Sequence, residues 1–216
     1  MKIRQTLLVL ALPLVVGSAH ANLLSNGSFE SMTAPVPPNA TAMLAPGSGS
    51  LTDWQVDGQT IAWIDNSNAW GLSSQDGLAF LDLTALKPTA PYGLVKQTIA
   101  TTAGSPYSLS FWFGTSTTYG VPASMLVSAG AASSTFTNSS VGTNTWTHYS
   151  LSFVGAPGAS TIISFLGTVP SNTNYIGLDN VSVTAVPEPS EALMLLAGLG
   201  FIGAIAVRRN KFKKQS

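Results

Sequence analysis

Strict alternation of apolar and polar residues between positions 106 and 114, in the run PYSLSFWFG, restricts the fold more than any other feature. One face of the run carries Tyr107, Leu109, Phe111 and Phe113, and the other carries Ser108, Ser110 and Trp112. Side chains alternate in this way along an extended strand, because successive Cβ atoms point to opposite sides. Residues 147–154 repeat the period, with Tyr149, Leu151 and Phe153 on one face and His148, Ser150 and Ser152 on the other. Both runs predict strands that bury one face.

Further short runs between turn residues predict more strands, and no stretch between positions 22 and 185 shows a sustained helical period. These strands are expected at 59–64, 78–83, 94–100, 123–129, 133–138, 160–167 and 175–184. About nine strands without helices predict an all-β domain of two sheets packed face to face, a β-sandwich or jelly roll. The proline-rich residues 31–50 are expected to form a long loop.

The first residues, 1–21, predict a secretory signal peptide. Lys2 and Arg4 precede an apolar core from Leu7 to Val16, and Ala19-His20-Ala21 has the small-x-small pattern of a cleavage site. The mature chain should then begin at Asn22, after export through the Sec translocon. A retained N-terminal membrane helix is the alternative; the short core and its Pro13 argue against it.

Residues 186–216 combine a stiff motif, an apolar run and a basic end. Pro187-Glu188-Pro189 precedes an apolar segment from Ala192 to Val207, and Arg208, Arg209, Lys211, Lys213 and Lys214 follow it. Residues 191–207 are expected to form one transmembrane helix: the apolar residues make about 24 Å of helix, and snorkelling of Glu191 and Arg208 extends its reach toward the ~30 Å hydrocarbon core. The basic end should stay cytoplasmic, which places residues 22–185 outside.

This order of Pro-Glu-Pro, apolar helix and basic end closely resembles the PEP-CTERM sorting signal of Gram-negative bacteria. The resemblance implies that exosortase, a membrane-embedded transpeptidase, reads and removes the tail, and that the host makes extracellular polysaccharide. It also implies an inner-membrane precursor that ends at the cell surface or outside the cell. The alternative is an ordinary tail anchor behind a proline-rich stalk.

Charge and cysteine content exclude several functions. Residues 22–185 hold Lys87 and Lys96 against seven Asp and Glu side chains, a formal charge of −5. Nucleic-acid binding needs clustered Lys and Arg, so an acidic domain argues against it and suits cations or neutral glycans. The chain has no cysteine, which excludes a cysteine nucleophile, an iron–sulfur cluster and a thiolate zinc site.

Two short motifs, NGSFE at 26–30 and LDNVSV at 178–183, resemble the galactose-binding-like β-sandwich of many carbohydrate-binding modules and of some cell-wall proteins of unknown function. In these modules a structural calcium ion joins the first and last strands. The resemblance implies Glu30 and Asp179 as its ligands, with carbonyl groups of the 31–50 loop completing the shell. The alternative is that both residues are solvated carboxylates at strand ends.

Aromatic side chains indicate a glycan site, because sugar rings stack on exposed indoles. Trp112 lies on the face opposite Phe111 and Phe113, while Trp70 and Tyr119 look like loop aromatics. We expect Trp112, Trp70 and Tyr119, with Asp65 or Asn68, to bind extracellular polysaccharide. The alternative is that Trp112 packs in a second layer or under a loop. Trp54 and Trp63 are expected in the core.

Catalysis finds little support in the sequence. After signal removal His148 is the last histidine, and no Gly-x-Ser-x-Gly elbow is present. Asp pairs such as Asp53 and Asp57 are typical turn formers. The prediction is a non-enzymatic exported protein that binds carbohydrate. The alternatives are a structural matrix or adhesion protein without a specific ligand, and a secreted glycan hydrolase.

Overall fold

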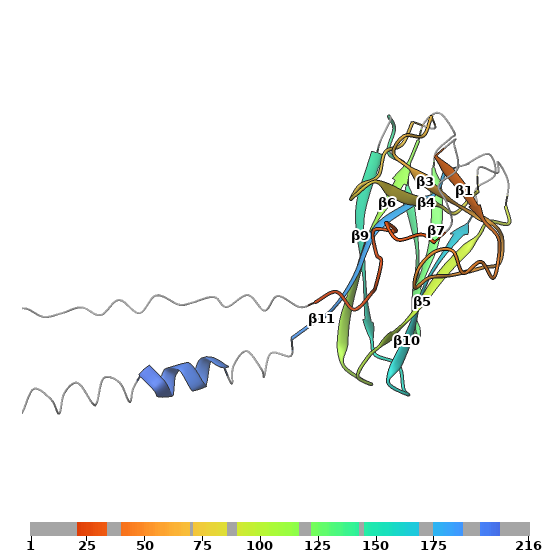
Figure 1. Ribbon diagram of the computed structural model, residues 1–216. Helices are drawn as coiled ribbons and strands as arrows, with labels where there is room; N and C mark the ends of the chain where they lie inside the picture. Colours follow the sequence, from red (N-terminus) through yellow and green to blue (C-terminus); the bar gives the residue numbers. More distant parts are fainter. Residues whose placement is uncertain are drawn as a thin grey trace, which may run out of the picture.

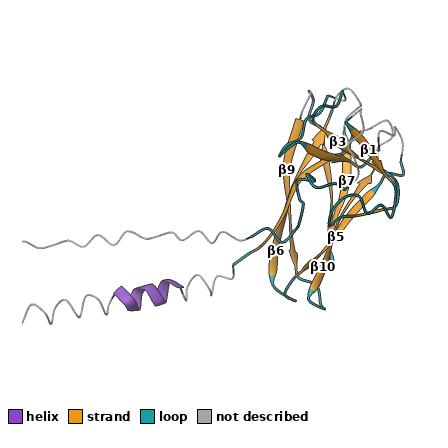
Figure 2. Cartoon of the chain, viewed as in Figure 1, coloured by secondary structure: helices purple, strands orange, loops and turns teal. Residues whose placement is uncertain are grey.

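The computed structural model describes residues 21–33, 40–69, 71–85, 90–116, 122–142, 145–168, 175–187 and 195–203. Two antiparallel sheets pack face to face, and both the start of the domain and its last strand lie on the same side (Figure 1). Strands dominate the described domain, as Figure 2 shows. The all-β jelly-roll sandwich predicted from the alternating runs is confirmed.

The larger sheet has six strands in the order β1-β3-β4-β11-β6-β9. Their bounds are Thr41–Leu44 (β1), Ile61–Asp65 (β3), Ala79–Asp82 (β4), Gly177–Ala185 (β11), Pro106–Thr115 (β6) and Thr145–Val154 (β9). The smaller sheet has the order β2-β5-β10-β7-β8. Its strands are Gln55–Asp57 (β2), Leu94–Ala100 (β5), Ser160–Thr168 (β10), Ala123–Ala129 (β7) and Ala132–Asn138 (β8).

All nine predicted strands are present, and the structure adds β1 and β2. Strand β1 lies inside the segment predicted as a loop, so that prediction is wrong for Thr41–Leu44. Its four residues are too few to show a clear period, and only their pairing with β3, from Thr41 opposite Ile64 to Leu44 opposite Ile61, makes them a strand.

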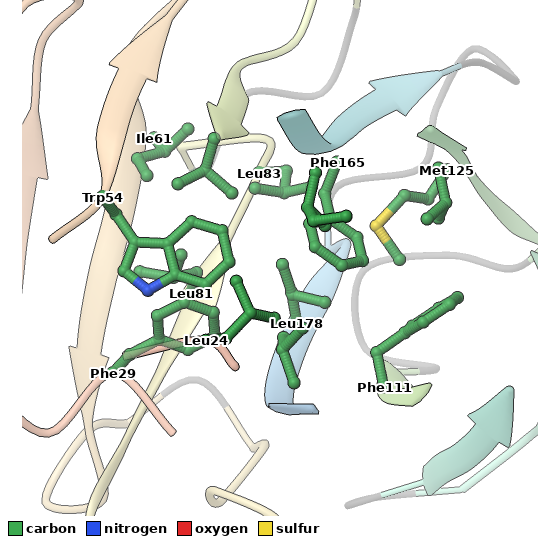
Figure 3. Close-up of a cluster of buried hydrophobic side chains, with 14 of the residues drawn as sticks. Leu24, Phe29, Trp54, Ile61, Leu81, Leu83, Phe111, Met125, Phe165 and Leu178 are labelled. Carbon is green, nitrogen blue, oxygen red and sulfur yellow. The ribbon is translucent and has the colours of Figure 1, made fainter. Parts of the chain in front are cut away.

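The core between the sheets follows the alternation of the strands. Phe111 of β6 and Phe165 of β10 are fully buried and meet with ring centroids 5.3 Å apart. Figure 3 shows them beside Met125 and Leu178, with Trp54 and Phe29 on the other side of the cluster. Burying one such aromatic side chain contributes roughly 2–3 kcal/mol. The prediction that Trp54 and Trp63 are core residues is confirmed, since each is 4% exposed.

The first residues of the domain close the sandwich against its last strand. The Asn22 side chain donates to the Val181 carbonyl at 3.3 Å and accepts the Val183 N–H at 2.9 Å. The Leu23 N–H donates to the Val183 carbonyl at 2.9 Å. Further along, the Gln97 side chain holds the Ser25 backbone by two hydrogen bonds. These bonds join the residues after the expected cleavage site to the last strand and to β5.

A second, smaller core lies on the outer face of the six-stranded sheet. The connection between β3 and β4 crosses this face and buries Leu72 against Ile64, Phe80 and Tyr175. The outer face is thus divided into a half covered by this connection and a bare half formed by β6, β9 and the end of β11.

The C-terminal tail is described only in part. Residues 195–203 are helical and lie within the predicted transmembrane segment 191–207. In the part of the chain that the structure describes, no helix has the length and apolarity needed to span a membrane. The transmembrane helix therefore stays a prediction.

Candidate functional site

Trp112 lies at the boundary between the covered and the bare half of the six-stranded sheet. It pairs with Asp179 of β11 on one side and with His148 of β9 on the other. Its ring lies 5.1 Å from the exposed His148 ring, at an angle of 49°. The indole is only partly buried. The predicted orientation of Trp112, away from the core, is confirmed.

Between Trp112 and the Pro106–Val154 pair, the bare half presents a group of hydroxyl side chains, which we call the hydroxyl strip. The pairing of β6 with β9 and β11 places them side by side on one face: Ser108, Ser110, Ser150, Ser152, Ser182 and Thr184. All six are partly or fully exposed. Hydroxyl groups both donate and accept hydrogen bonds, so this surface matches the hydroxyl groups of a sugar chain.

Trp146 fixes the covering connection next to Trp112. Its indole lies over Gly114 of β6 and contacts Phe80 edge-on, with ring centroids 5.7 Å apart. A methyl group at Gly114 would lie 2.8 Å from two carbons of the ring. The indole N–H donates to the Ser73 carbonyl at 2.8 Å. Trp146 thus joins the edge strand β9 to the connection. This role was not predicted from the sequence, although a glycine opposite a tryptophan on the neighbouring strand is a signal for it.

Glu30 and Asp179 converge on the same short segment of this connection, residues 75–79. Asp179 Oδ2 accepts the N–H groups of Gln75 at 2.7 Å and Asp76 at 3.0 Å. Glu30 Oε1 accepts the N–H groups of Leu78 and Ala79, both at 2.9 Å. The two carboxylates predicted as a pair therefore hold the two ends of one turn.

Asp179 is fully buried beneath this turn, whereas Glu30 is exposed. Burial raises the pKa of the Asp179 carboxyl to about 7, against the lowering effect of hydrogen bonds from Asp76, Asn180 and Gln75. Loss of hydration disfavours the charged form, and here it outweighs the three N–H donors. Because this pKa lies near 7, a proton and a cation would compete for the Asp179 carboxylate near neutral pH.

The donor atoms of Glu30 and Asp179 are hard carboxylate oxygens of the kind that calcium prefers. Asp179 Oδ1 accepts one N–H, from Asn180 at 2.6 Å, and so keeps a lone pair. Among the described residues no cluster of three or more His, Cys, Asp or Glu side chains is placed to hold a metal. The two carboxylates thus fit calcium in chemistry, with the other ligands left to carbonyl groups or water.

Asp65 and Asn68 lie in the turn that follows β3. Asp65 Oδ1 accepts the Ser67 N–H at 2.8 Å, and the Asn68 side chain donates to the Asp65 carbonyl at 2.8 Å. Strands β4 and β11 separate β3 from β6, which places this turn about 14 Å from Trp112 at ~4.8 Å per strand. The structure therefore does not bring Asp65 and Asn68 into contact with Trp112, and their part in glycan binding stays a prediction.

Several predicted residues lie outside the described part of the chain. They are Trp70 and Tyr119 of the predicted glycan site, and Glu188 and Pro189 of the sorting motif. Pro187, the first residue of that motif, is described and follows directly on Val186, whose N–H donates to the Pro106 carbonyl at 2.9 Å.

An open hollow of about 390 Å³ lies on the side of the molecule where β2 meets β5. Trp54, Gln55, Lys96 and Thr98 contribute to its wall. Lys96 forms an ion pair with Asp57 at 2.7 Å, and this hydrogen bond with Lys96 lowers the pKa of the Asp57 carboxyl. Lys96 is thereby paired, and the exposed Asp53, which also lines the hollow, adds an acidic side chain to its wall.

Comparison with protein families finds two matches that together account for most of the chain. The family described as "Protein of unknown function (DUF642)" matches residues 22–183. The PEP-CTERM protein-sorting motif matches residues 185–210. The predicted sorting signal is confirmed, and its boundary with the domain agrees with the end of β11. No curated protein sequence matches the chain.

The domain is similar to several solved structures at low sequence identity. The enzymatically active domain of bacteriophage CBA120 tailspike protein 4 has a TM-score of 0.42 and 19% identity, covering 76% of this chain and 21% of its own. TmCBM61, solved with β-1,4-galactotriose, has a TM-score of 0.46 and 16% identity, with 77% and 99% covered. The arabinose-bound α-L-arabinofuranosidase MgGH51 has a TM-score of 0.51 and 14% identity, with 77% and 26% covered. This chain thus spans about a fifth of the first protein and a quarter of the third.

Proposed function

The chain belongs to the DUF642 family, and on that premise we propose that it is an exported, surface-sorted protein whose β-sandwich binds carbohydrate without catalysing a reaction. The PEP-CTERM motif at residues 185–210 supports the sorting. The signal peptide directs the chain through the Sec translocon, and residues 191–207 hold the precursor in the inner membrane. Exosortase then cuts near Pro187-Glu188-Pro189 and releases the domain to the extracellular polysaccharide.

The observation that carries carbohydrate binding is the position of Trp112. Its partly exposed indole stands where the covering connection ends and the hydroxyl strip begins. A sugar ring stacked on the indole would place its neighbouring hydroxyl groups over Ser110 and Ser150, while Gln75 and Asn180 border the covered side. Apolar C–H groups of a pyranose fit an electron-rich ring, and hydroxyl groups fit the strip.

Charge supports a neutral glycan in this place. From Gln97 to Leu178 the sequence contains no Asp, Glu, Lys or Arg, so β6, β9 and β10 carry none of these side chains. Arg or Lys side chains commonly recognise a uronate or sulfate, and Lys96, the lysine described on the domain, is paired with Asp57 on the other sheet.

Binding of purified residues 22–187 to a glycan array and to the matrix polysaccharide of the producing bacterium tests the proposal. Trp112→Ala is expected to weaken binding about tenfold, which corresponds to ~1.4 kcal/mol of stacking. Met43→Ala is the matched control, because Met43 is a 52% exposed apolar side chain at the opposite edge of the same sheet. Equal binding by the Trp112→Ala protein would refute the site.

The two alternatives give different results in the same experiments. A structural matrix protein would bind no glycan on the array yet retain sorting. A hydrolase would release reducing ends from the polysaccharide, and this release would depend on His148 or on the Asp residues. Mass spectrometry of the surface protein tests the sorting itself: a new C-terminus near Pro187 is expected, and an intact Ser216 would contradict processing.

We also propose that Glu30 and Asp179 hold a structural calcium ion. Both side chains grip the 75–79 turn beside Trp112. A cation there would neutralise the buried Asp179 carboxylate and fix the covered border of the glycan site.

A further inference from the structure

The C-terminal tail leaves the sandwich at one defined end. Strand β11 pairs with β6 as far as Ala185 opposite Tyr107, and the Val186 N–H then bonds to the Pro106 carbonyl at 2.9 Å. Pro187 is therefore attached to a fixed point of the fold. From Pro187 to the start of the expected span at Glu191 the chain can reach at most about 14 Å, at ~3.5 Å per residue.

Three tight turns form this end, which we call the neutral end: residues 101–105, 130–131 and 155–159. They consist only of Gly, Ala, Ser, Thr and Pro. Gly104 donates to the Gly155 carbonyl at 3.0 Å, and Gly155 donates to the Ser105 carbonyl at 2.9 Å. Gly130 is hydrogen-bonded to Ile162 of β10 at 3.0 Å. The neutral end is thus a hydrogen-bonded surface rather than a set of loose loops.

Most charged side chains of the described residues lie away from the neutral end, and the nearest is Asp53, which lines the hollow with Thr98, two positions along β5 from Ala100. Asp179 pairs with Trp112, six positions along β6 from Pro106, which corresponds to about 20 Å at ~3.3 Å per residue. Glu30 binds Leu78 and Ala79, one position from Phe80 in β4. Lys96 lies four positions along β5 from Ala100.

Apolar side chains are exposed around the neutral end instead. Val154 is 58% exposed, Ile162 52% and Val186 43%. Val154 pairs with Pro106 at the end of β9, and Ile162 follows closely on the turn at 155–159. The acidic domain therefore presents a partly apolar surface without acidic side chains where its tether begins.

We infer that the neutral end rests on the lipid bilayer while the precursor is anchored. This inference relies on the proposed membrane anchoring of the tail. The short tether keeps this end within about two Debye lengths of the headgroups, where a net acidic surface would be repelled by anionic lipids and an uncharged one is not. The sandwich then stands on its neutral end, and Trp112 is held about 20 Å above it, facing sideways.

The absence of cysteine allows a direct test with single labels. Ala103→Cys and Ala131→Cys place a fluorophore on the neutral end, and Ala45→Cys is the matched control. All three alanines are exposed. Ala45 follows Leu44, and the strand pairing places Leu44 level with Thr115 at the other end of the sheet. Thr115 lies about 30 Å from Pro106 at the neutral end, at ~3.3 Å per residue. Each labelled chain, residues 22–216, is reconstituted in phosphatidylethanolamine vesicles with about 30 mol% phosphatidylglycerol.

Headgroup-labelled quencher lipids are expected to quench the labels at positions 103 and 131 about threefold more than the label at 45, given the short tether. Equal quenching of all three in chains that float with the vesicles would overturn the orientation and leave anchoring intact. The same result would follow if a protein partner, rather than lipid, held the neutral end. A chain that does not float with the vesicles would overturn both the anchoring and this inference.

Discussion

The buried Asp179 carboxyl predicts that the domain loses stability as the pH rises through neutrality. Its pKa is about 7 in the folded protein, against 3.8 when the side chain is free. Because the folded pKa is the higher one, folding favours the protonated form. The stabilising contribution is therefore complete below about pH 4 and is lost as the pH rises through about 7.

The size of the effect follows from the shift. A shift from 3.8 to about 7 corresponds to about 4 kcal/mol, at ~1.36 kcal/mol for each pKa unit. A change of about 4 kcal/mol is expected in the free energy of unfolding. It is a large part of the 5–15 kcal/mol that typically separates folded and unfolded domains, so it should be measurable.

Urea unfolding of residues 22–187 between about pH 4 and pH 8, in EDTA so that only protons compete for the site, measures this contribution. The wild-type free energy should fall across this range by up to about 4 kcal/mol more than that of Asp179→Asn, which cannot ionise. Asp53→Asn is the control, because it makes the same Asp-to-Asn change at an exposed position. Identical slopes for the wild-type and Asp179→Asn proteins would refute the reasoning that desolvation dominates the three N–H donors.

The remaining predictions concern the calcium proposal, packing beneath Trp146 and the N-terminal closure. Removal of calcium by a chelator at about pH 8 should lower the melting temperature by several degrees, and an unchanged melting curve would exclude calcium at Glu30 and Asp179. Gly114→Ala should destabilise the domain by ~1–3 kcal/mol and alter tryptophan fluorescence, because the new methyl group meets the Trp146 ring at 2.8 Å. Gly49→Ala is its control, since nothing lies within 4 Å of a methyl group there. Asn22→Ala should cost ~1–3 kcal/mol in chemical unfolding by removing the bonds to Val181 and Val183, and a loss below the error of the measurement would show that the closure contributes nothing.

The strands and the core could be predicted because both follow from local alternation. The faces of β6 and β9 are those that the sequence indicates: Phe111 and Phe113 are buried, while His148 and Ser150 are exposed. The resemblance implied Glu30 and Asp179 as a pair of calcium ligands, whereas their shared hold on residues 75–79 is seen only in the structure.

Features that depend on distant pairing could not be predicted in this way. Strand β1 exists through its partner β3, and its four residues carry no period of their own. The outer core is hidden from periodicity because β4 is buried on both faces, so Phe80 and Leu81 are equally inaccessible. Trp146 has the sequence context of a surface aromatic, and only the two glycines beneath it, Gly114 and Gly177, explain how it lies flat on the sheet.

The position of β11 determines when the domain can fold. This strand is the last in the chain and lies between β4 and β6 inside the larger sheet, and the residues around Asn22 also bond to it. A polypeptide threaded across a membrane from its N-terminus therefore lacks its central strand until residue 185 has emerged. Until then the larger sheet lacks the strand that joins β4 to β6, so the domain can complete its fold only after its last strand has crossed.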